Sequence, residues 1–288
     1  MPVVFVLIWS TGFVVARYGM PHAPPLGFLA LRFALSVLCF AAWIAWARVA
    51  WPSSRAQWLH LGATGVLLHA GYLGGVWMGV KLGLGAGLAA LIVGLQPVLT
   101  ALWMSAQGAN HRVTLRQWTG LALGLAGLLL VVWHKLGVGE AAGVSVACAV
   151  GALLSITIGT LYQKRFVQPC DVRSASCVQL LAALAVTLPL AVIESYTPLG
   201  GWRWHPELAG ALAWSVLALT LGGSSLLYLL IQRGAATQVS SLMYLVPPCT
   251  AVLAWMLFGE SLGPFVLLGL ALSAVGVALV VKQAAPKR

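Results

Sequence analysis

The sequence has little charge and very few acidic residues. Charged residues make up 7% of its 288 residues, and five are Asp or Glu, whereas hydrophobic residues make up 61%. About 25% of the residues in an ordinary soluble domain are charged. Because so apolar a chain cannot cover its core with a polar surface, the composition excludes a soluble globule. It indicates a protein that lies mostly within a lipid bilayer.

Cysteine is sparse as well, and its spacing carries no metal or disulfide signal. There are five cysteines and no CxxC pair, at Cys39, Cys148, Cys170, Cys177 and Cys249. An odd number without metal-ligand spacing argues against a disulfide framework or a zinc site and favours apolar filling of the core. We therefore expect no metal and no cofactor.

Catalytic motifs are missing too. The sequence contains no GxSxG, no HExxH and no Walker loop. An intramembrane protease or acyltransferase needs a nucleophile with a base, or a carboxylate pair, at membrane depth. The acids fall in predicted loops or at predicted helix ends, so we expect the protein not to be an enzyme.

What the sequence does contain is a set of long apolar stretches. A spanning helix needs about 20 mainly apolar residues, and ten such stretches follow one another with short gaps, at residues 3–20, 25–47, 57–80, 84–105, 116–134, 141–163, 174–194, 208–232, 236–258 and 262–282. The first begins almost at Met1 without a charged segment before it or a small-residue cleavage site after it, so we expect it to be a retained helix rather than a signal peptide.

Basic residues dominate the net charge of +11 and follow the loops. They form no stripe with interleaved aromatic residues, so a nucleic-acid partner is not expected. With a cytoplasmic N-terminus, eleven lie inside (Arg48, Arg55, Arg112, Arg116, Lys164, Arg165, Arg173, Arg233, Lys282, Lys287 and Arg288) and four outside (Arg17, Lys81, Lys135 and Arg203). This asymmetry predicts that both termini are cytoplasmic.

One pattern occurs twice in the chain. Residues 91–132 and 241–281 align Pro97 with Pro247 and Thr100 with Thr250, and their final runs, LALGLAGLLLVV and LALSAVGVALVV, match at seven of twelve positions. Such a repeat divides the chain into two halves of five spans, residues 1–138 and 139–288. Because five is odd, the halves are inverted. The predicted fold class is therefore all-α, a polytopic membrane protein of ten transmembrane helices in two inverted five-helix repeats.

Equivalent spans of the two halves are interrupted by proline. Gln96 precedes Pro97 in the fourth span, and Tyr244 precedes Pro247 and Pro248 in the ninth. Proline removes a backbone hydrogen bond and breaks the helix. Interrupted helices at corresponding places in two repeats are the best sequence indication of a transporter's binding site.

The third span combines glycines with polar and aromatic residues. Gly71, Gly75, Gly79, Gly83 and Gly87 recur every four residues, which favours close approach of another helix. His69 and Tyr72 lie three residues apart and share a helix face, with Trp77 nearby. We interpret this face as part of a cavity; the alternative for His69 is a hydrogen bond to a neighbouring helix.

Further polar residues fall within the first, second and eighth spans. The first contains Trp9, Ser10 and Thr11, whose hydroxyls either bond back to their own helix or line a cavity. Arg32 in the second span is a functional candidate because a charge in the bilayer is costly, and the alternative is an arginine that snorkels to the surface or binds carbonyls of a broken neighbour. The eighth span contains Ser224, Ser225 and Tyr228.

Several motifs in their order resemble the drug/metabolite transporter superfamily, in its ten-helix EamA branch. They are WSTG in the first span, PPLxxLALRF at the start of the second, QP and PP in the interrupted spans, GESL after the ninth and the closing GLALxxxG. One departure is that Gln107, Gly108 and Ala109 stand where the second half has Gly259 and Glu260. The resemblance covers nearly the whole chain, and it implies that Arg32 is a structural residue.

Within that branch the chain is similar to bacterial aromatic amino-acid exporters. The resemblance implies an inner-membrane exporter of aromatic and other neutral amino acids and hydrophobic compounds. Its cavity would be shaped by the first, third, fourth, sixth, eighth and ninth helices. Aromatic walls suit an aromatic ring, and uncharged donors suit a zwitterion, so the expected contacts are Trp9, Ser10, Thr11, His69, Tyr72, Trp77, Gln96, Ser224, Ser225, Tyr228 and Tyr244.

The main alternative is efflux of lipophilic cations. Four-helix multidrug relatives use an acidic residue in their first helix, and this sequence has Trp9 to Gly12 there without an acid. A scramblase or scaffold would not require two matching broken helices. The expected partners are the amino-acid substrate and the lipid bilayer. Glycine-rich fifth and tenth spans favour packing within the bundle, so we expect a monomer or a weak dimer.

Overall fold

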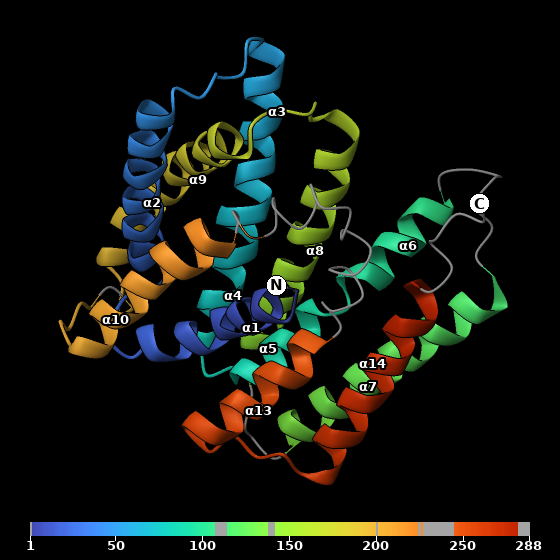
Figure 1. Ribbon diagram of the computed structural model, residues 1–288. Coiled ribbons are helices and arrows are strands. Elements are labelled where there is room, and N and C mark those ends of the chain that lie inside the picture. Colours follow the sequence, from blue (N-terminus) through green and yellow to red (C-terminus); the bar gives the residue numbers. More distant parts are fainter. Residues whose placement is uncertain are drawn as a thin grey trace.

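The structure is a computed structural model that describes residues 2–106, 114–137, 142–199, 201–223, 226 and 245–281. Every secondary-structure element in these ranges is helical, and the elements form one bundle (Figure 1). The predicted spans agree with the described helix ends to within three residues. The predicted end of the eighth span and start of the ninth lie outside the described residues.

The first half contains five helical segments, two of them divided. They are α1 (Pro2–Gly19), α2 (Pro25–Ala47), the series α3 (Arg55–Gly65), η1 (Val66–Gly71) and α4 (Tyr72–Lys81), the pair α5 (Ala86–Val93) and α6 (Gln96–Ala106), and α7 (Leu115–Gly137). The second half follows the same order with α8 (Gly143–Phe166), α9 (Val172–Ser195), α10 (Pro206–Trp214) joined to η2 (Ser215–Gly222), α13 (Val246–Phe258) and α14 (Pro264–Val281).

The helices have the length and apolarity that a bilayer requires. Among the described residues, α2, α8 and α9 are each long and apolar enough to cross a membrane alone, and shorter apolar helices lie within α1, α5 with α6, α7, α10 with η2, α13 and α14. Tryptophans near the helix ends are exposed, including Trp46, Trp133 and Trp204. Their amphipathic rings suit the membrane–water interface, so their positions agree with the expected aromatic belts.

Helices α7 and α14 pack directly against each other, and their contacts are reciprocal. A β-carbon on Gly127 would lie 2.5 Å from the carbonyl oxygen of Gly269, and one on Gly276 would meet the carbonyl oxygen of Gly120. The alignment of the final runs equates Gly127 with Gly276 and Gly120 with Gly269. Each contact therefore becomes the other when the halves are exchanged, which is the signature of a two-fold relation. In Figure 1 the two helices run side by side.

The glycine series of the third span packs against the second half. A β-carbon on Gly75 would lie 2.7 Å from the carbonyl oxygen of Cys148 and 2.9 Å from the β-carbon of Ala152, and one on Gly79 would lie 3.0 Å from the carbonyl oxygen of Ser145. Only a residue without a side chain allows α4 and α8 to approach this closely. The expectation of close helix packing is confirmed for these two glycines.

This contact gives a stability prediction with a matched control. Gly75→Ala is expected to destabilise the protein by about 1–3 kcal/mol, because the new methyl group must displace backbone atoms. Gly151→Ala, on an exposed position of α8 with open space around it, should be neutral or stabilising, since alanine favours helix. Thermal unfolding in detergent compares them. Equal unfolding temperatures for the two variants would contradict the packing described.

Candidate functional site

The third and eighth helices each contain a π-helical segment. We expected continuous helices over 57–80 and 208–232, and the structure corrects this: η1 divides α3 from α4, and η2 follows α10. Single π turns inside α-helices are frequent at functional sites, because they shift the hydrogen-bond register and free backbone groups. With Pro97 aligned to Pro247, residues 66–71 correspond to residues 216–221. Both halves are thus irregular at the same place.

η1 contains one polar side chain, that of His69. None of its six residues is buried, although α3 and α4 on either side contain buried residues. His69 lies in η1, and its ring meets the Phe33 ring of α2 in an edge-on contact at 6.1 Å between centroids. Tyr72 begins the next helix and is buried. The structure therefore brings His69 and Tyr72 together, as their spacing predicts.

Arg32 completes this polar group from α2. Its guanidinium interacts electrostatically with both Tyr72 and His69. Its Nε and Nη2 atoms donate to the hydroxyl oxygen of Thr220 in η2, at 3.3 and 3.1 Å, and the side chain of Thr220 donates in turn to the carbonyl oxygen of Ser215 at 2.8 Å. Arg32 is 7% exposed, so it does not snorkel to the surface. Its partner on the broken neighbour helix is a hydroxyl, where we expected a carbonyl.

Trp77 occupies a packing position. Its side chain is 1% exposed and stacks on Phe28 of α2 with a centroid separation of 4.4 Å. A β-carbon on Gly19 of α1 would lie 3.4 Å from the same indole. In this conformation Trp77 joins α1, α2 and α4, and it presents almost no surface to a ligand.

The proline-interrupted helices meet. α5 ends at Val93, and a new helix begins at Gln96 with Pro97 as its second residue, a position where the missing N–H of proline leaves no hydrogen bond unmade. α13 likewise begins with Pro247 and Pro248 in its first turn. A β-carbon on Gly94 would lie 2.7 Å from Cγ of Pro247. Small clefts flank the contact, one of them lined by Gly94, Pro247 and Pro248.

Side chains from α8 bind both irregular helices of the first half. Gln96 donates its amide to the hydroxyl of Thr160 at 2.9 Å. Ser155 donates to the carbonyl oxygen of Leu67 in η1 at 2.8 Å. Freed backbone and amide groups in a membrane protein need such partners. One helix of the second half thus holds the break at Gln96 and the π segment.

The hydroxyls of the first helix bond to their own backbone and also link neighbouring helices. Ser10 donates to the Val6 carbonyl at 2.8 Å, and its own carbonyl accepts from Thr250 of α13 at 3.1 Å. Thr11 accepts from Nε1 of Trp214 at 2.8 Å. Trp9 is half-buried beside Phe5.

Part of the predicted site cannot be placed. Ser224, Ser225, Tyr228 and Tyr244 lie outside the described residues. The expected contributions of the eighth and ninth helices beyond η2 and before Leu245 therefore stay predictions.

Two glutamates of the second half cap helices of the first, which the sequence reading missed. Glu194 at the end of α9 accepts from the backbone N–H groups of Leu26 and Gly27 at 2.9 and 3.0 Å. Glu260, after α13, accepts from those of Ala86 and Gly87 at 2.8 and 3.4 Å. A carboxylate at a helix N-terminus satisfies free donors and interacts favourably with the helix dipole. The sequence signal is that Glu194 ends one predicted span and Glu260 comes just after another.

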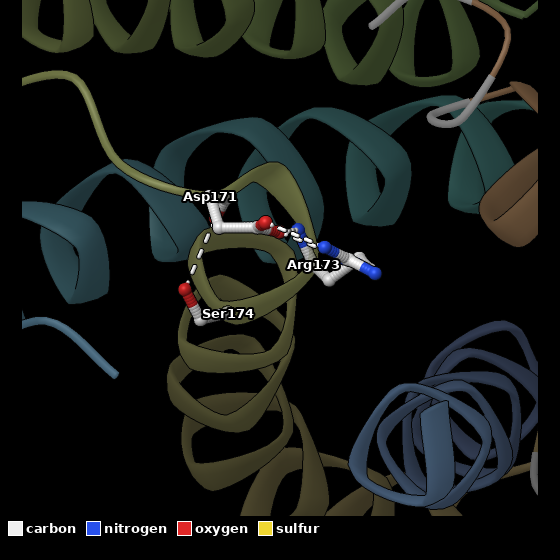
Figure 2. A network of polar contacts seen from close by, with 3 residues as sticks. All are labelled: Asp171, Arg173 and Ser174. Carbon is white, nitrogen blue, oxygen red and sulfur yellow. Dashed lines mark hydrogen bonds and ion pairs between the residues drawn. The ribbon is translucent and has the colours of Figure 1, made fainter. Parts of the chain in front are cut away.

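The opposite end of the bundle is held differently. α9, the counterpart of α2, is capped by its own Asp171, which accepts from the Arg173 N–H at 2.9 Å and pairs with the Arg173 guanidinium at 2.7 Å (Figure 2). Hydrogen bonding to Arg173 holds the pKa of Asp171 below its usual range, so this cap is charged at neutral pH. At one end of the bundle, glutamates of the second half cap helices of the first half. At the other end, α9 is capped by a residue of its own half.

Comparison with known proteins identifies the fold. Residues 2–133 and 143–282 match the EamA-like transporter family. A probable amino-acid metabolite efflux pump of Salmonella typhimurium is 27% identical, covering 94% of this chain and 90% of the relative. The uncharacterized inner membrane transporter YedA of Escherichia coli is also 27% identical (95% and 87%), and an uncharacterized transporter of Archaeoglobus fulgidus is 24% identical (95% and 93%).

A solved structure shares the architecture. One crystal structure superposes with a TM-score of 0.65 at 18% identity, over 97% of this chain and 95% of the other, which shows a common fold. Both the family match and the helix order support an all-α membrane protein of ten helices in two inverted five-helix repeats, as predicted. Since the family pattern extends over nearly the whole sequence in two successive blocks, this chain belongs to the EamA-like transporter family.

Proposed function

We propose that this transporter exports aromatic and other neutral amino acids by alternating access. The observation that carries the proposal is the group formed by His69 in the half-buried segment η1, Tyr72 at the start of α4, and Arg32 of α2, which bonds to Thr220 in the π segment of the second half. Transporter substrates bind where interrupted helices of two repeats meet. The Salmonella typhimurium relative is named as a probable amino-acid metabolite efflux pump, which favours the same substrate class here.

The chemistry of this region suits a zwitterion with a side chain. The His69 ring and the Gln96 amide supply uncharged hydrogen-bonding groups for the ammonium and carboxylate. Arg32 is buried and bonded to Thr220, so it holds η2 beside these groups as a structural residue. The Tyr72 ring, next to His69, offers aromatic surface for a substrate ring, whereas Phe33 is fully buried and supports the His69 ring by packing. Transport requires no covalent step, and none is assigned to these residues. Trp77 supports the region by packing, as its burial indicates.

The proposed location is the bacterial inner membrane with both termini in the cytoplasm. The basic residues of the loops support this orientation. Gly201 is exposed with open space around it, in the loop between α9 and α10. A Gly201→Cys variant should be labelled by a membrane-impermeant maleimide added from outside, whereas native Cys170 should require permeabilisation. Labelling of Cys170 but not of residue 201 from outside would show that the protein has the opposite orientation.

Transport by the purified protein in sealed vesicles tests the substrate. Labelled tryptophan or phenylalanine should equilibrate faster in vesicles that contain the protein, and unlabelled methionine and threonine should compete. Competition only by a quaternary cation would favour multidrug efflux instead. Equal rates with and without the protein would refute the proposed function.

A further inference from the structure

We propose that His22, His205 and Glu207 form a binding site for a divalent transition-metal ion of the zinc class. His22 lies in the turn between α1 and α2, and His205 and Glu207 lie at the start of α10. One potential ligand atom of each residue lies within 4.8 Å of those of the other two. His22 belongs to the first half of the chain, and His205 and Glu207 belong to the second. None of the three is part of the motifs or of the proposed transport site.

The distances suit metal coordination. Nε2 of His22 lies 3.1 Å from Oε2 of Glu207, and Nδ1 of His205 lies 3.8 Å from the same oxygen. Ligand atoms of a tetrahedral zinc ion at about 2.0–2.1 Å lie about 3.4 Å from one another. A metal ion could therefore replace the hydrogen bond between His22 and Glu207 once one imidazole rotates out of the parallel stack with the other, so that both ring nitrogens point at the ion.

The backbone holds the two loops together. The N–H of Arg203 donates to the carbonyl oxygen of His22 at 2.8 Å, and the imidazole rings of His22 and His205 stack at 4.7 Å with an interplanar angle of 7°. Nδ1 of His205 accepts a long hydrogen bond of 3.3 Å from the Glu207 N–H, which a metal would displace. The two rings are thus already next to each other, held by the backbone of their loops.

The donor set selects the metal class. Two imidazoles and one carboxylate suit zinc and neighbouring transition metals, whereas calcium and magnesium prefer oxygen ligands alone. Three protein ligands leave one position for water. Side chains of His205 and Glu207 are each 50% exposed, so an ion can enter from solution. Cysteine spacing gives no sign of this site, and His22 lies 185 residues before Glu207 in the sequence.

Metal binding would join the α1–α2 turn to the start of α10. A bridge between the two halves at this end would oppose any separation of these elements. Slower transport in the presence of zinc is therefore expected, and this consequence rests on the proposed function. Metal binding itself does not depend on the proposed function, so binding and transport are measured separately.

Metal titration of the purified protein, prepared without a histidine tag, tests the site. Cobalt(II) should bind in one equivalent with the visible absorption of a nitrogen-ligated ion, and zinc should displace it. His22→Ala and Glu207→Gln should each weaken binding by more than about tenfold, the loss caused even by removing an outer partner of a metal ligand. His134→Ala, on a histidine that packs against Phe265 instead, should bind as the unmodified protein does.

The outcomes separate clearly. The His22→Ala and Glu207→Gln variants should elute as monodisperse protein, and circular dichroism should show the same helix content as the unmodified protein. Absence of saturable cobalt binding, or binding equal in all four proteins, would overturn the metal site. Zinc binding with unchanged transport would retain the site and remove only its effect on exchange between conformations.

Discussion

Replacing His69 and Tyr72 together by alanine is expected to reduce amino-acid transport by more than about tenfold, which corresponds to about 1.4 kcal/mol of binding free energy. The reason is that both side chains belong to the polar group around η1, where Arg32 interacts with each of them. Tyr72 is 8% exposed and belongs to the packed core, so the variant is first checked for elution as folded, monodisperse protein. Initial rates of tryptophan uptake into vesicles measure the effect.

A second histidine and tyrosine pair provides the control. His60 of α3 bonds to the hydroxyl of Tyr162 in α8 at 2.8 Å, away from η1. His60→Ala with Tyr162→Ala removes the same residue types and should retain most of the transport rate. A comparable loss of transport rate in both double variants would show that η1 has no special role. Full transport activity of the His69 and Tyr72 variant would show that these two residues are not part of the substrate site.

Glu260→Ala is expected to destabilise the transporter by about 1–3 kcal/mol, because hydrogen bonds to a charged group contribute about that much. Its carboxylate binds the first N–H groups of α5 from the turn after α13. A β-carbon on Gly85 would lie 2.5 Å from the same carboxylate, so the contact is close. Loss of this cap should release the start of the first interrupted helix, and both the unfolding temperature and the transport rate should fall.

Three substitutions of Glu260 distinguish the loss of its capping hydrogen bonds from the loss of side-chain volume. Glu260→Gln keeps an acceptor oxygen of the same reach and loses the charge, so its unfolding temperature should lie between those of the unmodified protein and Glu260→Ala. Glu260→Asp shortens the side chain and should resemble alanine. Unfolding temperatures that do not follow this order would contradict the capping role.

Much of the fold follows from the sequence because bilayer thickness fixes helix length. The α2 boundaries, 25–47, were predicted without error, since Pro24 and Pro25 mark its start and Arg48 follows its end. Proline likewise placed the break before Gln96. Glycine spacing predicted that another helix packs closely on α4, but it did not identify α8 as that helix. These features depend on local residue types, which a single sequence displays.

The π segments and the caps depend on contacts between distant residues. No residue in Val66–Gly71 excludes an ordinary α-helix, and the register shift is held by partners such as Ser155 of α8. Glu194 and Glu260 act on helices about 170 residues away in sequence. Trp77 looked like a cavity wall because it follows Tyr72, whereas its neighbour Phe28 comes from another helix.

The most direct measurement of the central claim, a solvent-accessible substrate chamber at η1, is chemical modification of a cysteine at residue 70. Ala70→Cys lies beside His69 in the middle of the third helix, and Leu181→Cys lies in the middle of α9 on an exposed apolar position; each would be made with the native cysteines replaced. The account predicts that a water-soluble maleimide modifies residue 70 but not residue 181, and that tryptophan slows the reaction. Residue 70 as unreactive as residue 181, or a rate that tryptophan leaves unchanged, would contradict it.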